Sequence, residues 1–290
     1  LTGEQRDLPE YEQKDGCTMV PLKFDPSGSM FVVFRRETRS SKLATGDSSR
    51  KNFPEFKPVQ EIAGAWSAQL DPKWSGLTKA VTFDKLDDWA KRPEEAIKYF
   101  SGSAVYHKVF DLDAEVGSRK SEVRTSNSDL RPLSSDLSPR LFLDLGKVAI
   151  MVEVKLNGKN LGILWKAPYR VDITDAVKAG ENVLEIRVVN LPINRMIGDE
   201  FLPEDSERNK NGTLRKWPQW LEEGKPSPTG RFTFTSWRLW KKDEPLQESG
   251  LLGPVTVRTA LSAIRGEISR AGEADAGNGS PRIVNIINFI

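Results

Sequence analysis

The chain lacks several features that would reveal its chemistry or its surroundings. Its 290 residues include one cysteine, Cys17, so no disulfide can form within it and its redox compartment is not revealed. The only histidine, His107, leaves a histidine-based metal site without a second ligand, and a Ser-His-Asp triad would depend on this one residue. We expect His107 to lie on the surface of a strand. No apolar run reaches the roughly 20 residues that a membrane-spanning helix needs, so we expect no membrane partner.

Charge of one sign is also missing. The 43 basic and 41 acidic residues give a formal net charge of only +2. Nucleic-acid-binding proteins usually carry a clustered basic face, so we expect no nucleic-acid partner. The chain begins with Leu1 and has no basic, apolar leader, so we expect a mature or partial chain with any signal peptide outside it.

The stretch 154–190 predicts a series of short antiparallel strands. Asn157-Gly158 accepts the positive φ angles of a type I′ turn and joins the first two strands. Residues 169–173 form a third strand, and 174–180 contain the cap and the terminating glycine of a short helix. Residues 183–189 alternate between two faces, with three apolar side chains on one of them. This order of elements is typical of an antiparallel sandwich.

The rest of the chain predicts a main domain with a segment on either side. We interpret 1–60 as a partial β segment, from a preceding domain or a linker, with one strand at 29–36. We interpret 61–260 as the main domain, with a mobile polar loop at 117–139, and 261–290 as a disordered tail. Further strands are expected at 66–70, 80–83, 103–112, 140–145, 148–156, 161–165, 232–235 and 253–259. Because strands dominate and helices are short, the predicted fold is all-β, a jelly-roll β-sandwich.

Short sequence pieces between residues 62 and 257 carry a family resemblance. The more specific ones are YFSGSAVY (99–106), NRMIGD (194–199) and SGLLGPV (249–255). Others lie at Trp66, 86–89, 143–146, 156–158, Gly162, Trp165, 168–174, 180–182 and Asn190. Together they resemble the galactose-binding-like, sugar-binding β-sandwich of glycoside hydrolases. The wider match is with family 2, and the closer match is with the C-terminal region of family 106, the bacterial α-L-rhamnosidases.

This resemblance implies a role without catalysis. Members of the family carry their catalytic carboxylates on a separate (β/α)₈ barrel, and nothing here alternates strand and helix at barrel spacing. We therefore assign no catalytic residue, and we expect the catalytic barrel of the same parent chain as a partner and a rhamnose-containing glycan as a ligand. The resemblance also implies a secreted or periplasmic protein. No cofactor is expected; calcium is compatible with jelly-roll modules, but no compact Asp-rich loop supports it.

The most specific polar cluster combines Asn194, Arg195 and Asp199. Arg195 can bind a carboxylate with two nitrogens, and Asp199 is its obvious local partner. We favour a structural ion pair that holds the loop after strand 183–189. The alternative is a loop that contacts sugar hydroxyls or the barrel. Asp144 is interpreted as the polar side of an edge strand, and Asp172 as a turn residue that satisfies backbone donors.

The eight tryptophans supply the candidates for stacking on sugars. Trp66 and Trp89 are predicted core residues. The better stacking candidates are Trp165 and Tyr169, with four tryptophans in the irregular region after residue 190: Trp217, Trp220, Trp237 and Trp240. Aromatic residues at a domain face also pack against neighbouring domains.

Three functions therefore stay open. The chain is a non-catalytic module of an α-L-rhamnosidase-like enzyme, an independent carbohydrate-binding module, or a domain that is itself catalytic through sandwich carboxylates.

Overall fold

The computed structural model describes residues 5–6, 8–15, 17–36, 51–113, 140–260 and 281–289. The predicted loop at 117–139 lies outside the described residues. The chain divides into two compact units. The first unit comprises 1–59, 118–142 and 258–290, and the second comprises 60–117 and 143–257.

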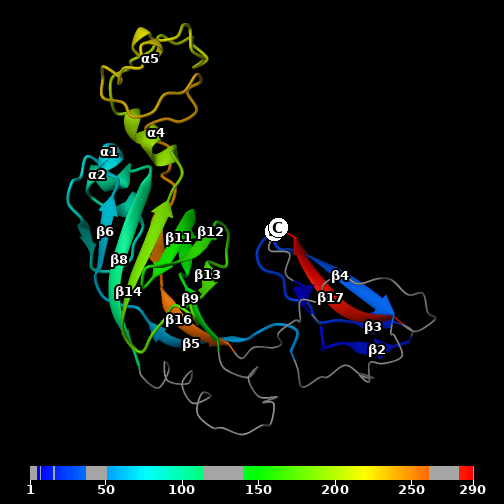
Figure 1. Ribbon diagram of the computed structural model, residues 1–290. Helices are drawn as coiled ribbons and strands as arrows, with labels where there is room; N and C mark the ends of the chain where they lie inside the picture. The colour runs from blue at the N-terminus through cyan, green and yellow to red at the C-terminus, as the bar shows by residue number, and fades with distance from the viewer. Residues whose placement is uncertain are drawn as a thin grey trace. The chain divides into compact units, whose positions relative to one another are not determined.

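The first unit contains a three-stranded sheet in the order β1-β17-β4. Its strands are β1 (Gln5–Arg6), β17 (Pro281–Phe289) and β4 (Ser29–Arg36), the last of which was predicted from the sequence. β17 pairs antiparallel with β4 along its whole length, so the expectation of a disordered tail does not hold for these nine residues (Figure 1). A hairpin of β2 (Glu12–Lys14) and β3 (Cys17–Met19) also belongs to this unit.

The second unit is built on a six-stranded antiparallel sheet in the order β12-β11-β14-β8-β6-β7. These strands are β12 (Lys159–Leu164), β11 (Met151–Leu156), β14 (Gly180–Val189), β8 (Ser103–Leu112), β6 (Trp66–Leu70) and β7 (Val81–Phe83). A second layer has the order β13-β9-β16-β5 (Figure 1). Its strands are β13 (Arg170–Asp172), β9 (Arg140–Asp144), β16 (Thr256–Ala260) and β5 (Phe56–Glu61). A short antiparallel pair is formed by β10 (Lys147–Ala149) and β15 (Gly250–Gly253). The predicted all-β sandwich is confirmed.

Alternation along the strands builds the core of this unit. In β14 the predicted apolar face, Leu184, Ile186 and Val188, is fully buried, and the alternate residues are exposed or half-buried. Trp66 and Trp89 are buried as predicted, and Trp89 Nε1 donates a hydrogen bond of 2.6 Å to the Tyr106 hydroxyl. Burial raises the pKa of Tyr106, so this phenol stays neutral in the core.

The Asn-Gly turn is held in place by its own side chain. Asn157 and Gly158 have φ angles of 52° and 78°, as a type I′ turn requires. Asn157 Nδ2 donates to the Ala176 carbonyl (2.9 Å) and to Asn182 Oδ1 (2.8 Å), and its Oδ1 accepts from the Val183 amide (3.0 Å). The hairpin tip is therefore tied to the turn before β14 and to the first residues of β14.

Two local predictions are wrong. Residues 174–176 form a turn and 175–179 contain no helix, and at the start of this turn Asp172 Oδ1 accepts a hydrogen bond from the Thr174 amide (2.8 Å). This confirms Asp172 as a turn residue. Residues 232–235 form no strand, and the Phe232 and Thr233 amides donate to the Asp199 carboxylate instead of to a strand partner.

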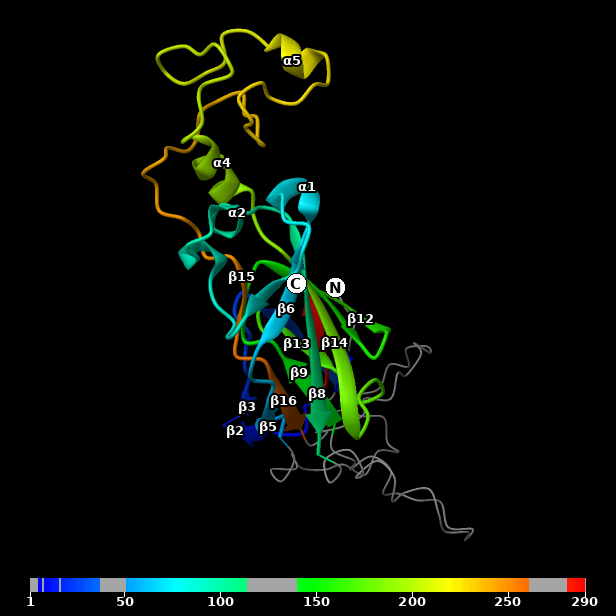
Figure 2. The same ribbon diagram turned by 90° about the vertical axis from the view of Figure 1, so that its left-hand side faces the viewer.

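Helices are short and lie at one end of the sheets. They are α1 (Pro72–Ser75), the 3₁₀ turn η1 (Trp89–Lys91), α2 (Glu95–Lys98), α4 (Ile193–Asp199) and α5 (Gln219–Glu222). Between α4 and β15 the chain makes a long excursion, residues 200–248, which we call the lobe. In both views the lobe, with α5 in it, projects beyond α4 on the side away from the strands (Figures 1 and 2).

Candidate functional site

The two ends of the lobe are joined by a buried polar network. Asn194, in the first turn of α4, exchanges hydrogen bonds with the backbone of Gln247 (2.7 and 2.8 Å) and donates to Ser249 Oγ (3.1 Å). Asn190 also donates to Ser249 Oγ (3.2 Å), and the Ser249 amide donates to Asp88 Oδ1 (2.9 Å). The four side chains of the network are buried, whereas Gln247 takes part only through its backbone. The network therefore holds residues 247–249 beside the start of α4, and Asn194 is occupied within the chain.

Asp199 fastens the middle of the lobe to the same helix. Its Oδ2 accepts from the Phe232 amide (3.0 Å), the Thr233 amide (2.7 Å) and the Thr233 hydroxyl (2.7 Å). Its Oδ1 lies 3.0 Å from Arg195 Nε, at an angle that makes this contact an ion pair and not an aligned hydrogen bond. The Arg195 guanidinium also lies 4.9 Å above the Phe232 ring. Arg195 and Asp199 thus form an ion pair, and Asp199 holds the lobe, in line with the structural interpretation that we favoured from the sequence.

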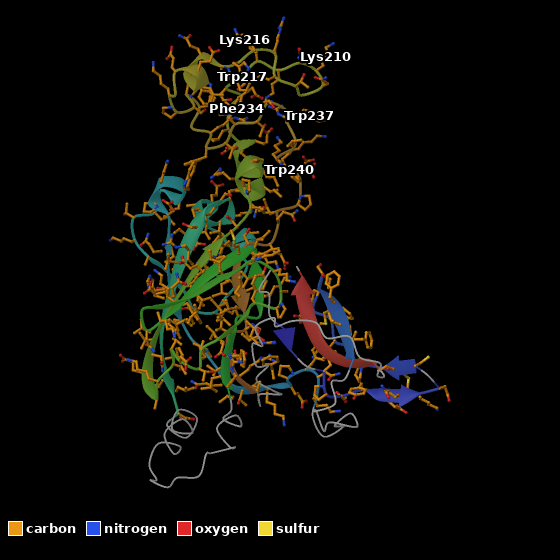
Figure 3. The ribbon with its side chains drawn as sticks, turned by 45° about the vertical axis from the view of Figure 1, so that its right-hand side comes forward. Lys210, Lys216, Trp217, Phe234, Trp237 and Trp240 are labelled. Carbon is orange, nitrogen blue, oxygen red and sulfur yellow. The ribbon has the colours of Figure 1, made fainter. Side chains whose placement is uncertain are left out.

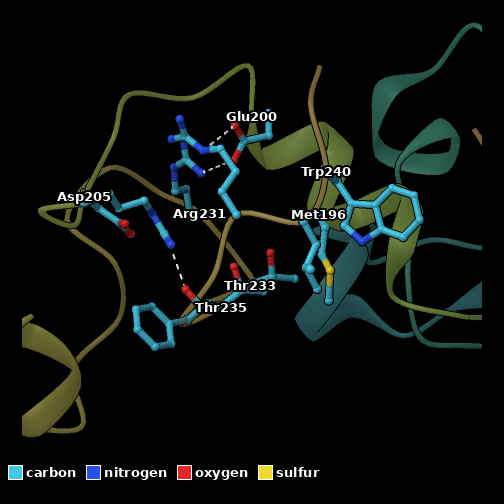
Figure 4. A pocket seen from close by; sticks show the side chains of 11 residues that line it. Met196, Glu200, Asp205, Arg231, Thr233, Thr235 and Trp240 are labelled. Carbon is cyan, nitrogen blue, oxygen red and sulfur yellow. Dashed lines mark hydrogen bonds and ion pairs between the residues drawn. The ribbon is translucent and has the colours of Figure 1, made fainter. Parts of the chain in front are cut away.

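A charged hollow lies behind this anchor. It occupies about 360 Å³ including open solvent, and its walls come from α4 and the lobe (Figure 4). Glu200 accepts from Arg231 Nη1 (2.9 Å) and lies 3.1 Å from Arg238 Nε. Arg231 also donates to two lobe carbonyls, and Arg208 Nη2 donates to the Thr235 carbonyl (2.8 Å). Arg238 also pairs with Glu204.

This hollow holds the lobe together and offers little to a ligand. Its three arginines, Arg208, Arg231 and Arg238, all bind carboxylates or carbonyls of the chain. Burial lowers the pKa of Arg208, but a guanidinium titrates so high that it stays charged. Met196 and Trp240 line one end, away from Asp205 (Figure 4). Trp240, a predicted stacking residue, is half-buried there.

The buried carboxylates Asp144 and Asp199 both accept hydrogen bonds from neighbouring groups. Asp144 accepts from Arg170 Nη2 (2.7 Å), Arg170 Nε (3.1 Å) and the Gly146 amide (3.0 Å). Its strand, β9, lies between β13 and β16, so the edge-strand interpretation of Asp144 is wrong. Asp87, which the sequence did not single out, has a pKa raised by burial, with Arg92 acting against the shift. A general acid needs such a raised pKa, but Asp87 does not line the hollow described above.

Trp165 belongs to an exposed apolar patch at one end of the six-stranded sheet. It follows β12, whose Leu164 pairs with Val152 beside Met151, and Met151 pairs with Val189 of β14. We define the sheet-end patch by its exposed large apolar side chains, which are Ile150, Met151, Trp165 and Leu191. Tyr169, by contrast, is mostly buried, and its hydroxyl donates to the Ile150 carbonyl (2.6 Å). Its pKa is raised by burial, and it supports the backbone under the patch.

The other candidate aromatics lie along the lobe (Figure 3). Trp220 donates through Nε1 to the Asp205 carbonyl (3.1 Å) and packs edge-on against Phe234. Trp217 also packs against Phe234, with ring centroids 5.7 Å apart, yet is 57% exposed. Trp237 is equally exposed, at 57%, and its Nε1 donates to the Asn211 carbonyl (3.1 Å). The exposed sequence-predicted aromatics therefore lie in two regions, the lobe and the sheet-end patch. The polar candidates Asn194, Arg195 and Asp199 lie on α4.

Sequence reasoning missed the polar residues that organise both ends of the lobe. Ser249 and Asp88 are 161 positions apart in the chain and meet only through the fold. The available signals were the presence of Ser249 in the SGLLGPV piece, of Asp88 in the 86–89 piece, and Asn190 itself. His107 is exposed on β8, as predicted. In the part of the chain that the structure describes, no group of three or more His, Cys, Asp or Glu side chains could hold a metal ion. None of the described helices is long and apolar enough to cross a membrane.

Comparisons with known proteins relate the chain to glycoside hydrolases. No family model matches the sequence. The chain is 43% identical over 211 residues to a putative beta-glucuronidase of Formosa agariphila, a match that covers 73% of this chain and 16% of that protein. It is also similar to the rhamnosidase from Novosphingobium sp. PP1Y, with 29% identity and a TM-score of 0.59. That match covers 86% of this chain and 19% of the rhamnosidase chain. The chain thus spans less than a fifth of the length of either relative, and it is a glycoside hydrolase-related domain.

Proposed function

We propose that the chain is a non-catalytic β-sandwich module of a larger, α-L-rhamnosidase-like glycoside hydrolase. In this role it supports a catalytic (β/α)₈ barrel of the same polypeptide. The observation that carries the proposal is the match of nearly the whole chain to a small part of a rhamnosidase with the same sandwich. A secreted or periplasmic location goes with this proposal.

The state of the carboxylates supports a non-catalytic role. Glycoside hydrolysis needs two carboxyl groups that face one bond, about 5 Å apart for retention or about 6.5–9.5 Å apart for inversion. Asp199 and Asp144 are instead buried and occupied by backbone amides and arginines. Because their oxygens are bound within the chain, these two carboxylates do not form a pair that faces a substrate bond.

The named substrates of the two relatives differ, one being a rhamnosidase and the other a putative beta-glucuronidase. We favour the rhamnosidase-like assignment because the similarity to the rhamnosidase extends over 86% of the chain. It also agrees with the YFSGSAVY, NRMIGD and SGLLGPV pieces of the sequence.

The sheet-end patch is the surface that we propose for contact with the barrel. Trp165 is 53% exposed there, and it follows Leu164, which pairs with Val152 beside the exposed Met151. Contiguous exposed apolar residues of this size mark contact sites between domains more often than open surface. An independent carbohydrate-binding module is the second candidate, because the exposed tryptophans of the lobe suit a sugar ring.

The activity of the purified chain tests the non-catalytic assignment. We expect no turnover of an aryl α-L-rhamnoside or an aryl β-D-glucuronide by the 290-residue chain, measured by release of the aryl group against a buffer blank. Turnover that is abolished by Asp87→Asn or Asp199→Asn, in variants that keep the wild-type circular dichroism spectrum, would overturn the proposal and make the sandwich itself the catalyst.

A further inference from the structure

Three segments of the lobe form a small sheet-like platform under Trp237. Residues 208–214 turn back on themselves, with Asn209 and Thr213 joined by a backbone hydrogen bond of 2.9 Å and Arg208 bridged to Leu214. Residues 236–238 lie along the second arm of this turn. Thr213 bridges to Trp237, and the Leu214 amide donates to the Ser236 carbonyl (2.7 Å). We call residues 207–215 with 236–238 the tryptophan platform.

The Trp237 ring is held in one orientation while much of it faces water. Its Nε1 donates to the Asn211 carbonyl, and its edge lies over Gly212, where an added Cβ would be 3.5 Å from Cδ1 of the ring. The ring is 57% exposed. Exposed apolar area is unfavourable by about 25 cal/mol per Å², so a ligand that covers the ring gains binding free energy without a cost for ordering it.

Polar side chains of the hairpin that bridges to Trp237 through Thr213 are also fixed in orientation. The Thr213 hydroxyl donates to Asn211 Oδ1 (2.7 Å) and accepts from Asn209 Nδ2 (3.0 Å). These bonds turn the two amides so that Asn209 Oδ1 and Asn211 Nδ2 make no hydrogen bond to any described residue. The platform thus presents one acceptor and one donor beside an apolar ring, the combination that sugar-binding sites use.

Two cations on the platform are also available. Neither Lys210 nor Arg215 forms an ion pair with the described residues. Lys216 is the main cause of the lowered pKa of Glu207, and the charge of Arg215 adds to it only from a distance. Lys210 and Trp237 are labelled on one side of the lobe and Lys216 and Trp217 on the other (Figure 3). This differs from the charged hollow, where every arginine is occupied.

We infer that the tryptophan platform binds an acidic sugar unit of a glycan, a hexuronate. The C–H face of the pyranose ring lies on Trp237, its hydroxyls reach the free amide groups of Asn209 and Asn211, and its carboxylate faces Lys210 and Arg215. The inference deepens the proposed function and rests on it. It names the class of glycan on which the module would hold the enzyme.

Two tryptophans of the lobe provide a matched test. The probes are polygalacturonate, alginate and glucuronoxylan, with fully methyl-esterified polygalacturonate as the uncharged counterpart, measured by affinity electrophoresis of the 290-residue chain. We expect retardation by at least one acidic polymer, weaker retardation by the esterified one, and about tenfold weaker binding in Trp237→Ala, which corresponds to about 1.4 kcal/mol. Trp217→Ala removes an equally exposed indole away from the platform, so its binding should stay within about twofold of wild type. Trp237→Phe should recover part of the binding.

Several results would overturn the inference. They are no retardation by any of the acidic polymers, equal losses in the Trp237 and Trp217 variants, or binding unchanged in Trp237→Ala. Equal binding of the esterified and acidic polymers would show that the carboxylate is not recognised, and would overturn the assignment of a hexuronate. Each of these results is independent of the aryl glycoside assay, so failure of the platform and failure of the non-catalytic assignment remain distinguishable.

Discussion

A single carboxylate, that of Asp199, connects a helix to a segment more than thirty residues away. It is 1% exposed, and it receives two amides, one hydroxyl and one guanidinium. An ionised carboxylate can be buried only when such groups replace the water that it loses. The residue is therefore accounted for by its structural role, and its place in the NRMIGD piece needs no catalytic explanation.

Removal of this carboxylate should be costly. Asp199→Ala leaves Arg195 buried without its partner and three donors of residues 232–233 without an acceptor. We expect the free energy of unfolding to fall by about 3 kcal/mol in urea denaturation. Glu222→Ala, at an exposed acidic position of the same lobe, should change it by less than about 0.5 kcal/mol. A loss at Asp199 no larger than that at Glu222 would contradict the structural role.

At the scale of the element, β15 depends on glycine because it runs directly over a buried tryptophan. Gly250 has a φ of +103°, and a Cβ there would lie 2.6 Å from Trp89 Nε1. Nearby, Gly146 approaches the backbone of Gly253 so closely that a Cβ would lie 2.5 Å from its carbonyl. The glycines of SGLLGPV therefore allow β15 to lie against the η1 turn that carries Trp89.

Alanine substitutions at two glycines with positive φ distinguish the effect of the contact with Trp89 from the effect of backbone strain. Gly250→Ala and Gly224→Ala both place a side chain at positive φ, but a Cβ at Gly224 would have no atom within 4 Å. We expect Gly250→Ala to lower the free energy of unfolding by about 2 kcal/mol more than Gly224→Ala, because of overpacking against Trp89. Equal effects in thermal or urea unfolding would show that β15 is not held against Trp89.

At the scale of the whole molecule, the chain combines a sandwich with a lobe that adds no strand to either sheet. The sandwich is stabilised by buried apolar side chains, whereas the described part of the lobe is held mainly by ion pairs and hydrogen bonds to carbonyls. Such a lobe contributes little core, and its exposed tryptophans are better explained by contact with other molecules than by stability of the fold.

The proposed contact with a barrel can be tested by comparing the chain alone with the longer enzyme. Trp165→Ala should leave the Tm of the isolated chain within about 1 °C, because the ring is exposed there, and lower that of the longer polypeptide by several degrees. Val109→Ala, an exposed apolar position on β8, serves as the control and should have no effect on either protein. Equal shifts for Trp165→Ala in the two proteins would contradict docking through the sheet-end patch.

Much of the fold could be predicted because the positions of strands are indicated by patterns among neighbouring residues. Alternation in β8 and β14, the Asn157-Gly158 turn and the buried faces are properties of neighbouring residues. The pairing of Arg195 with Asp199 follows equally from their spacing of four along a helix. At 232–235 the Phe232 and Thr233 amides donate to Asp199, more than thirty residues away, which no local pattern reveals. At 175–179 a local turn beside Asp172 replaces the predicted helix.

The sequence by itself determined the all-β class, the positions of most strands and the relation of the chain to sugar-binding sandwiches, because these depend on local periodicity and turn chemistry. Only the tertiary structure decided which polar groups are occupied. Asp199, Asp144 and the arginines of the hollow are satisfied by partners far along the chain, whereas Asn209, Asn211 and Lys210 keep polar groups that no described residue binds. A hydrogen bond is made by whichever group the fold brings within about 3 Å, and sequence distance does not report that separation.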